Sequence, residues 1–479
     1  MRSPQAIPVD APPTTVLAFA RASRRRFVDD LMAFLRFASV GAQPAQADEM
    51  RHCAGWLAAH LRAIGLEHVR VLPSAGHPVV VADWLHRPGA PTLLVYGHYD
   101  VQPAEPFGAW TTPPFVPSLR DGYLYARGAA DDKGQLFVHV KAIESWLRAT
   151  GTLPLNVRCL FEGDEETGSA GLPAFLAAHP ETAHADAAVL SDTWMPAPDR
   201  PAIVESLRGV LGIELEAIGQ RHDLHAGNYG GALRNPLQAL SDVLCRLHDA
   251  HGRITIPGFY DRVRTLPADE RAYMARHGPT DAQVLADAGA VEGWGEPGYS
   301  LYERTTVRPA LEITTLAGGY AGPGAKSVVP ARALARLDFR LVPCQDPARV
   351  ERLVRAHFRR EMPGGVQLRM RTLMQAAPAT MPRDHPAVGA AVAACHAVFS
   401  AMPLFLRLGG TIPVVDLLRR RGMPVVAMGF ALPDDAMHAP DERFLLANYF
   451  RGIEASVRFL SRVARTGKAA PVIAAGAPS

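Results

Sequence analysis

The first half of the chain alternates between helical and strand-like hydrophobic patterns. Apolar residues recur with helical spacing over residues 27–35 and again over 50–64, which predicts two helices. Short apolar runs follow, and helical stretches such as residues 134–148 separate them. Short apolar strands that alternate with helices are typical of a largely parallel sheet buried on both faces. This part of the chain therefore predicts an α/β domain.

Three of the apolar runs lead directly into acidic residues or histidines, and a fourth runs toward a histidine. The runs over residues 92–96, 155–161, 187–190 and 425–428 lead to His98 and Asp100, to Glu165 and Glu166, to Asp192, and toward His438. In open parallel sheets, binding sites form beyond the C-terminal ends of the strands. The polar residues therefore gather where this fold places its sites.

The middle of the chain carries the pattern of a second, smaller domain. Residues 210–218, 311–316, 334–342 and 366–372 have strand-like patterns. Helices are predicted to begin after Asn235 and Asp346, because each precedes a proline, as is typical of a helix N-terminus. The order β-α-β-β-α-β predicts a ferredoxin-like α+β fold. Residues 251–308, rich in glycine, proline and charge, are interpreted as an insertion on this domain.

Chain length agrees with two domains, because 479 residues exceed what one hydrophobic core usually organises. We expect the larger domain to comprise residues 1–206 and 385–479, and the smaller one residues 207–384. The tail from about residue 467 is rich in alanine, glycine and proline, and it is predicted to be disordered.

The charge pattern gives no support to a nucleic-acid partner. The formal net charge is only +3, and the two dense basic runs, residues 24–26 and 419–421, lie in amphipathic contexts typical of a solvated helix face. The longest apolar run, about residues 388–406, contains His396 and Pro403, so a packed helix leading into a strand is favoured over a membrane span.

Cysteine usage and the N-terminal residues favour the cytoplasm. The five cysteines are far apart and form no Cys-x-x-Cys pair, so we expect buried free thiols in a reducing compartment. The apolar run over residues 16–20 is too short for the core of a signal peptide. The first 28 residues are rich in arginine with a single acid, which leaves a transit peptide open.

The residues at the strand ends have the composition of a metal site. The set comprises His98 and Asp100, Asp131 and Asp132, Glu165 and Glu166, Asp192, and His438. Zinc and related ions bind imidazole nitrogen and carboxylate oxygen, and two ions about 4 Å apart share a bridging carboxylate. Each segment alone has an ordinary explanation, such as a helix cap or a turn. Together, in order and at strand ends, they predict a site for two divalent cations.

The same segments resemble the M20 metallopeptidases, and among them the carnosinase-like dipeptidases. The motifs that carry the resemblance are VYGHYDVQP (95–103), ARGAADDKG (126–134), EGDEETGS (162–169), LHAGNYGG (224–231), GAKSVVP (324–330), FRLVP (339–343) and GGTIPV (409–414). The likeness extends from about residue 25 to 460. It implies a mostly parallel-sheet di-metal catalytic domain with an inserted ferredoxin-like lid domain.

The resemblance implies one role for each expected metal ligand. Asp131 would bridge the two ions, His98 and Asp192 would complete one site, and Glu166 and His438 would complete the other. Zinc is the expected metal, and manganese or cobalt would also suit a carboxylate-rich site with two histidines.

Two further acids are implied to act beside the metals. Glu165 would be the general base that takes a proton from a metal-bridging water and passes it to the leaving amine. Asp100 would hold the imidazole of His98 in the ligating tautomer. Glu165 and Glu166 are adjacent, so they can face different groups only where the chain turns, and Gly163 and Gly168 permit such a turn.

The lid is implied to contact the substrate. Arg340 would bind its C-terminal carboxylate, because a guanidinium matches a carboxylate, and Ser327 with the backbone at Gly410 and Thr411 would assist. In this family the equivalent of His225 reaches the active site of the other subunit and stabilises the oxyanion. We therefore expect a homodimer through the lid.

The predicted function is the hydrolysis of dipeptides or small peptides that have a free C-terminal carboxylate. An amidohydrolase of the same superfamily that acts on N-acyl amino acids, such as an aminoacylase, deacylase or desuccinylase, is the alternative. A binding protein without activity is disfavoured, because every expected ligand and the base are present. A phosphate-binding loop over residues 319–327 is excluded by Ala325, which stands where glycine is required, and no Gly-x-Ser-x-Gly elbow indicates a serine hydrolase.

Overall fold

The computed structural model describes residues 14–467, which form two compact units. Within the described residues, the first unit comprises 14–205, 381–405 and 412–467, and the second comprises 206–380 and 406–411. Residues 406–411 belong to the second unit, although the chain on either side of them belongs to the first. The predicted disordered tail lies, beyond Gly467, outside the described residues.

The first unit is built on a sheet whose central strands are parallel. The strand order is β1 (Glu67–Leu72), β2 (Val79–Trp84), β6 (Asn156–Glu162), β3 (Thr92–His98), β7 (Ala187–Leu190), β17 (Val425–Ala427), β8 (Ala202–Leu207) and β15 (Ala379–Thr380), with β16 (Leu404–Leu408) beside β8. Strand β15, the last two residues of β8 and residues 406–408 of β16 are counted with the second unit. Strands β6, β3, β7 and β17 run parallel to one another, and β1, β2, β8 and β15 pair antiparallel. The C-terminal ends of four neighbouring strands therefore meet at one edge.

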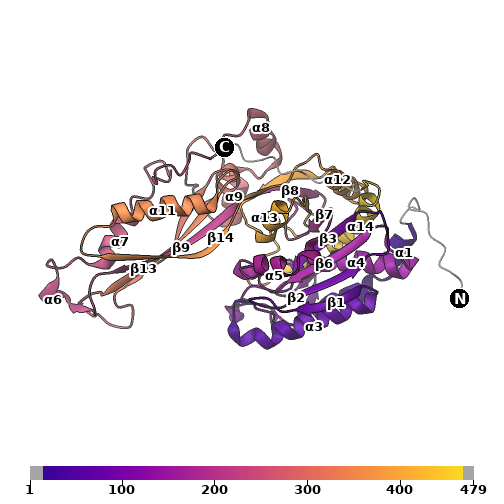
Figure 1. Cartoon of the computed structure of the whole chain (residues 1–479), viewed down its shortest axis with the longest axis horizontal. Helices are drawn as coiled ribbons and strands as arrows, with labels where there is room; N and C mark the ends of the chain where they lie inside the picture. The colour runs from indigo at the N-terminus through magenta and orange to yellow at the C-terminus, as the bar shows by residue number, and fades with distance from the viewer. Residues whose placement is uncertain (1–13, 468–479) are drawn as a thin grey trace. The chain divides into compact units, whose positions relative to one another are not determined.

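Helices bury both faces of this sheet. They are α1 (Thr14–Ala22), α2 (Arg24–Leu35), α3 (Ala47–Ile64), α4 (Lys133–Thr150), α5 (Leu172–Ala178), α12 (Pro386–Phe399), α13 (Pro413–Arg420) and α14 (Leu446–Val463). Helix α3 runs along β1 and β2, while α4 packs on β3 and against α14 (Figure 1). Strand β3 is buried at every position after its first residue, as a central parallel strand requires.

Short elements complete the first unit. They are the turns of 3₁₀ helix η1 (Pro44–Gln46), η2 (Phe107–Ala109), η3 (Glu165–Thr167) and η4 (Pro180–Ala183), and a small sheet of β4 (Ser118–Arg120), β5 (Tyr123–Tyr125) and β18 (Arg443–Leu445). The run predicted to be a helix leading into a strand is α12 followed by β16. No helix among the described residues is both long enough and apolar enough to cross a bilayer.

The second unit has the predicted ferredoxin-like order. Its strands β9 (Gly209–Ile218), β11 (Ala310–Gly318), β13 (Arg332–Leu341) and β14 (Gln367–Ala376) form an antiparallel sheet in the order β11-β13-β9-β14. Helices α7 (Pro236–Leu244) and α11 (Pro347–Glu361) cover one face (Figure 1). Both begin as predicted, because Asn235 and Asp346 accept the backbone N–H two residues on, at 2.9 and 3.1 Å. The predicted fold class is confirmed.

The remaining elements of the second unit lie in its connections. Strands β10 (Leu224–His225) and β12 (Val328–Val329) pair with each other, and α6 (Ala226–Tyr229) follows β10. The insertion contains α8 (Ala268–His277), α9 (Asp281–Ala288) and α10 (Leu301–Thr306). Helices α9 and α10 each start with a capping box, Thr280 with Gln283 and Ser300 with Glu303, which is a local signal that the sequence contains.

The cysteines differ in part from the prediction. All five are free, and Cys53, Cys159 and Cys395 are buried as expected. Cys245 and Cys344 are exposed, so the expectation that every thiol is buried is wrong. Cys245 follows the last turn of α7 and Cys344 lies in the turn before α11, where neither helix covers the side chain.

Candidate active site

The side chains predicted to bind metal meet at the C-terminal edge of the first unit's sheet. His98 ends β3, Glu165 and Glu166 lie in η3 just after β6, and Asp192 follows β7 by two residues. Asp131 immediately precedes Asp132, the residue at the start of α4, and His438 follows β17. Because β6, β3, β7 and β17 are parallel neighbours, their distant sequence segments end side by side.

Two groups of metal-ligand atoms form there. One consists of His98, Glu165 and Asp192 and the other of Asp131, Glu166 and His438, and the ligand atoms within each group lie within 4.8 Å of one another. Asp131 links the groups, because its Oδ1 lies 3.1 Å from His98 Nε2 and its Oδ2 lies 2.9 Å from His438 Nε2. One oxygen toward each group is the arrangement of a bridging carboxylate.

The electrostatics of the groups suit divalent cations. Burial, with Asp131 close by, raises the pKa of Glu166 to about 8 and holds the pKa of Asp192 well above its ordinary value. Burial also raises the pKa of Glu165 strongly, and Glu166 adds to the effect. Within the described residues, His98 Nε2 and Glu166 Oε1 are buried without a hydrogen-bond partner. Buried acids that repel one another and unpartnered ligand atoms together fit a pair of metal ions.

Asp131 differs from the other acids of the site. Burial would raise its pKa, but the neighbouring imidazoles of His438 and His98 outweigh that effect and lower it. Asp131 is therefore the carboxylate that stays ionised most readily. An ionised carboxylate between two histidines is suited to share two cations.

Asp100 holds both His98 and the turn that carries the two glutamates. Its Oδ1 lies 3.3 Å from His98 Nδ1, and its main-chain oxygen lies 3.1 Å from the same nitrogen. Its carboxylate also accepts the backbone N–H groups of Glu165 and Glu166, at 3.3 and 3.0 Å. With Nδ1 engaged in this way, His98 presents Nε2 to Asp131, as the predicted orienting role requires.

The chain turns between the adjacent glutamates as the glycines suggested. Gly168 ends the 3₁₀ turn with a φ of 91°, which disfavours residues that have a Cβ. At Gly163 an added Cβ would lie 2.6 Å from the ring of Tyr99. This turn places Glu165 in one ligand group and Glu166 in the other, and Gln102 Nε2 donates to Glu166 Oε2 at 2.8 Å.

Glu442 is a residue of the site that the sequence did not reveal. Its buried carboxylate accepts hydrogen bonds from Arg127 Nη1 at 2.7 Å and from the backbone N–H of Gly128, Ala130 and Asp131 at 2.9 to 3.1 Å. The loop that presents Asp131 is therefore held by one acid. Arg127 belongs to a conspicuous motif, but nothing local pairs it with Glu442, 315 residues away.

His139 also supports the site. It is buried in α4, with Nε2 at 2.7 Å from Ser191 Oγ and Nδ1 at 3.0 Å from Ser456 Oγ. Ser191 in turn donates to the main-chain oxygen of Met428 at 2.6 Å. These bonds fix the backbone immediately before Asp192.

The second unit brings Arg340 and Thr411 together. Arg340 lies on β13, where its guanidinium pairs with Asp338 at 3.0 Å and approaches Thr411 Oγ1 at 3.5 Å. Thr411 Oγ1 donates to the main-chain oxygen of Arg208 at 2.7 Å. Burial, together with nearby Arg340, lowers the pKa of Arg208 to about 10. Two guanidinium groups in such proximity favour an anion, and Gly410 beside them has open space at its Cβ position.

His225 and Ser327 lie elsewhere in the second unit. His225 is exposed and pairs with Val328 on the β10–β12 ribbon, and Ser327 O accepts the N–H of Ala226 at 3.1 Å. Strand β13 begins at Arg332, just after this ribbon, and Arg340 lies eight residues further along it. That distance is roughly 26 Å at the rise of an extended strand. One chain therefore does not bring His225 to Arg340.

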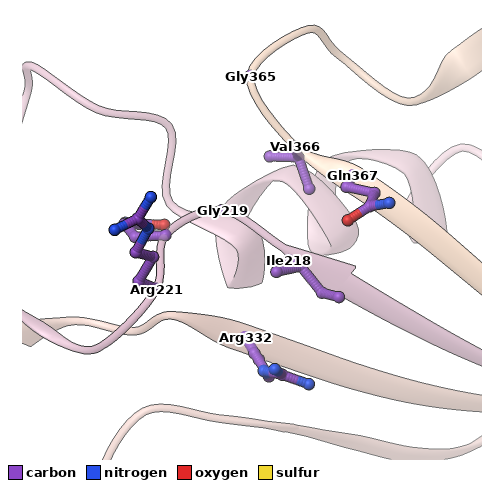
Figure 2. A pocket seen from close by; sticks show the side chains of 8 residues that line it. Ile218, Gly219, Arg221, Arg332, Gly365, Val366 and Gln367 are labelled. Carbon is purple, nitrogen blue, oxygen red and sulfur yellow. The ribbon is translucent and has the colours of Figure 1, made fainter.

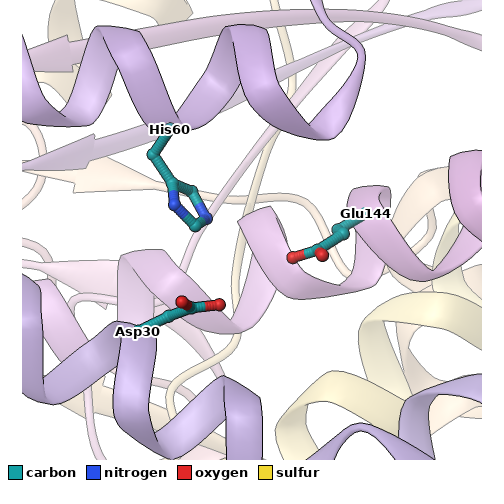
Figure 3. Close-up of side chains that lie close together, drawn as sticks. All are labelled: Asp30, His60 and Glu144. Atoms are coloured by element: carbon teal, nitrogen blue, oxygen red, sulfur yellow. The ribbon is translucent and has the colours of Figure 1, made fainter.

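A third group of potential ligands belongs to a salt-bridge network. Asp30, His60 and Glu144 face one another between α2, α3 and α4 (Figure 3). The buried ammonium of Lys141 lies among them, 2.6 Å from Asp30, 2.8 Å from Glu144 and 2.9 Å from His60 Nε2. Burial and the charge of Lys141 lower the pKa of His60 to about 4, so His60 is neutral and accepts from Lys141. The ammonium takes the place that a metal ion would need.

A hollow of about 610 Å³ lies in the second unit. It is found where β9 ends and β14 begins (Figure 2) and is lined by Ile218, Gly219, Gln220, Arg221, Arg332, Gly365, Val366 and Gln367. None of the predicted site residues lines it.

Known proteins resemble the chain over most of its length. The description Peptidase family M20/M25/M40 matches residues 94–462. The Cys-Gly metallodipeptidase dug1 of Schizosaccharomyces pombe is 30% identical over 395 residues, which cover 81% of this chain and 83% of that protein. The Beta-Ala-His dipeptidase of Homo sapiens is 30% identical over 398 residues, which cover 81% and 78%.

Solved structures agree with the sequence matches. An M20 family metallo-carboxypeptidase from Sulfolobus solfataricus is similar with a TM-score of 0.84 at 30% identity, covering 91% of this chain and 99% of that one. The resemblance expected from the motifs is thereby confirmed, and the chain belongs to peptidase family M20/M25/M40.

Proposed function

We propose that this protein is a metallo-dipeptidase that hydrolyses dipeptides or small peptides with a free C-terminal carboxylate. The observation that carries the proposal is the pair of ligand groups joined by Asp131, with one carboxylate oxygen toward His98 and the other toward His438. The matches to a Cys-Gly metallodipeptidase and a Beta-Ala-His dipeptidase support the same reaction.

The two groups would hold two divalent cations, for which zinc is the proposed metal and manganese or cobalt the alternatives. His98 and Asp192 would bind one ion, Glu166 and His438 the other, and Asp131 both. Bound there, the cations would polarise the amide carbonyl and make water a stronger acid. Asp100 would keep His98 in the ligating tautomer through Nδ1.

Glu165 is the proposed general base. It would take the proton of the attacking water on its carboxylate and deliver that proton to the leaving amine nitrogen. Its burial, which favours the protonated form, supports the second step, because a carboxylic acid is needed to donate. Its neighbour Glu166 belongs to the other ligand group, so the two carboxylates have separate tasks.

The second unit is proposed to recognise the substrate's C-terminal carboxylate. Arg340 would bind it with the Thr411 hydroxyl and the backbone at Gly410. Ser327 lies beside the β10–β12 ribbon, away from Arg340 of the same chain, so it is proposed to assist only from a second subunit. Arg208 supports this assignment, because its buried charge beside Arg340 has no carboxylate of its own among the described ion pairs. Arg340 already pairs with Asp338, so a carboxylate ligand would supply the second negative charge that the two neighbouring guanidinium groups need.

We also propose a homodimer through the second unit, in which His225 stabilises the oxyanion in the partner's active site. The length of β13 separates Arg340 from the ribbon that carries His225. His225 is therefore proposed to act in the active site of another subunit. Strand β11 is an edge strand, and its Ile313 and Leu316 side chains are 43% and 48% exposed. An exposed apolar edge is a ready site for pairing with a second copy. The free thiols support a reducing compartment, for which the cytoplasm is proposed.

Replacement of Glu165 by glutamine tests the function. We expect Glu165→Gln to lower kcat for a dipeptide such as Cys-Gly or β-Ala-His by about 100-fold to 10,000-fold, the usual range for loss of a general base. Metal content, measured by mass spectrometry, should remain at two ions per chain. The control Glu166→Gln should lose metal together with activity. Full activity in Glu165→Gln would refute the mechanism, and preference for N-acyl amino acids over dipeptides would refute the substrate class.

A further inference from the structure

The insertion on the second unit contacts the 406–411 segment, which carries Gly410 and Thr411. Tyr302 on α10 bonds to Arg407 twice, because its hydroxyl donates to Arg407 O and accepts from Arg407 N, both at 3.0 Å. Glu270 on α8 binds the Arg407 guanidinium at 2.8 Å. Two helices of the insertion therefore hold the backbone and the side chain of one residue.

The contacts continue along the same segment. At Gly409 an added Cβ would lie 2.4 Å from the main-chain oxygen of Thr305, so the segment passes directly against α10. Gly409 O accepts from Arg208 Nε at 3.0 Å. Thr411, two residues on, donates to Arg208 O and lies beside Arg340. A continuous series of contacts thus joins the insertion to the proposed carboxylate site.

The Tyr302 ring is itself held rigidly. It is 5% exposed and packs with Met274 and Val307 in the core of the insertion. An added Cβ at Gly278 would lie 2.3 Å from the ring, so only glycine allows this approach. Glu303, next to Tyr302, caps α10 and pairs with Arg271 at 2.6 Å. The hydroxyl is therefore presented at a fixed position rather than by a mobile loop.

We infer that the insertion sets the enzyme's affinity for the substrate carboxylate, with Tyr302 and Glu270 as positioning residues that hold the 406–411 segment against Arg208 and Arg340. The inference rests on the proposed carboxylate site. Neither Tyr302 nor Glu270 would contact the substrate. Each acts through Arg407, and the segment's backbone transmits the effect to Gly410 and Thr411.

Kinetics of zinc-loaded, full-length enzyme with a dipeptide and with its C-terminal amide test the inference. Tyr302→Phe removes the hydroxyl and keeps the ring. We expect it to raise KM for the dipeptide about fivefold to tenfold, the effect of losing hydrogen bonds of ordinary strength, with kcat within twofold. KM for the dipeptide amide should not change. Glu270→Gln should have the same selective effect.

Tyr299→Phe is the matched control, because the Tyr299 ring packs on Arg308 and Arg271 and its hydroxyl bonds to no described residue. It should leave both KM values unchanged. If wild-type enzyme does not prefer the dipeptide to its amide, the proposed carboxylate site is wrong. If wild type shows the preference and both Tyr302→Phe and Glu270→Gln keep its KM, only the positioning role is overturned. An equal rise for both substrates also overturns it.

Discussion

At the scale of single residues, buried acids organise the backbone around the candidate metal ligands. Asp100 accepts the N–H groups of Glu165 and Glu166, and Glu442 accepts three from the loop before α4. Buried backbone N–H groups need an acceptor, and these two carboxylates supply it. The position of Asp131 thus depends on Glu442, a residue that binds no proposed metal.

The two supporting acids were not equally visible in the sequence. Asp100 lies two residues from His98, so their relation is local and the motif contains it. Glu442 is 311 residues from Asp131. The residues next to it in the sequence form no motif that would single out this glutamate. Only folding brings a residue so distant to a loop whose N–H groups need an acceptor.

His139 leads to a prediction about pH. Burial lowers its pKa to about 3 from the ordinary 6.5, so the folded protein keeps it neutral while the unfolded chain binds a proton below pH 6.5. Stability is therefore present above pH 6.5 and is lost as the pH falls toward 3. For this residue the loss between pH 7 and pH 5 is about 2 kcal/mol. Urea unfolding at both pH values should show that His139→Gln lacks this part of the pH dependence.

The matched control is His52→Gln, because the His52 side chain is 68% exposed on α3. It should retain the pH dependence of the wild type. A His139→Gln variant with the same pH dependence as wild type would contradict the argument.

At the scale of elements, local signals placed the helices well. The Asn-Pro and Asp-Pro pairs at residues 235–236 and 346–347 predicted the starts of α7 and α11. The capping boxes that open α9 and α10 are equally local, although no helix was predicted there. Such signals lie within four residues of one another, so a sequence contains them in full. How helices pack on each other depends on contacts between residues that are far apart in the sequence, and local signals do not predict these contacts.

Lys141 is an example of packing that the helical pattern did not indicate. It is fully buried on α4 and joins α2 through Asp30, α3 through His60, and its own helix through Glu144. Without Lys141, Arg26 would be the remaining cation beside Asp30 and Glu144, at 3.3 and 2.6 Å. Loss of one member of a buried ion network costs at most roughly 3–5 kcal/mol. Lys141→Met should therefore shift the urea unfolding midpoint strongly downward.

Arg419→Met is a suitable control for that experiment. The Arg419 side chain is 51% exposed and pairs with Asp416 within one turn of helix, an ion pair worth at most about 1 kcal/mol. If Lys141→Met is no less stable than Arg419→Met, the network does not hold the three helices together.

At the scale of the whole molecule, the proposed exchange of His225 between subunits predicts complementation. His225→Ala and Glu165→Gln should each be nearly inactive alone. In a mixed dimer, the subunit with intact Glu165 would receive His225 from its partner and form one working site. Unfolding and refolding the two variants together should therefore restore up to about a quarter of wild-type activity, since half of the dimers are mixed and each has one working site of two.

The pairing of each variant with itself provides the control, because refolding either one alone should restore nothing. Light scattering establishes whether the products are dimers. If a mixture of confirmed dimers stays inactive, His225 does not act in the partner's site.

The classes of element, their order, the ferredoxin-like arrangement and the family motifs could all be predicted from the amino-acid sequence. Hydrophobic periodicity, caps and short motifs each involve residues that are close together in the sequence, so the sequence is enough to identify them. Which side chains meet follows only from the folded chain. His438 reaches Asp131 across 307 residues, Glu442 reaches the loop before α4, and Tyr302 reaches Arg407. Contacts of this kind depend on how strands pair and helices pack, which no spacing along the chain specifies.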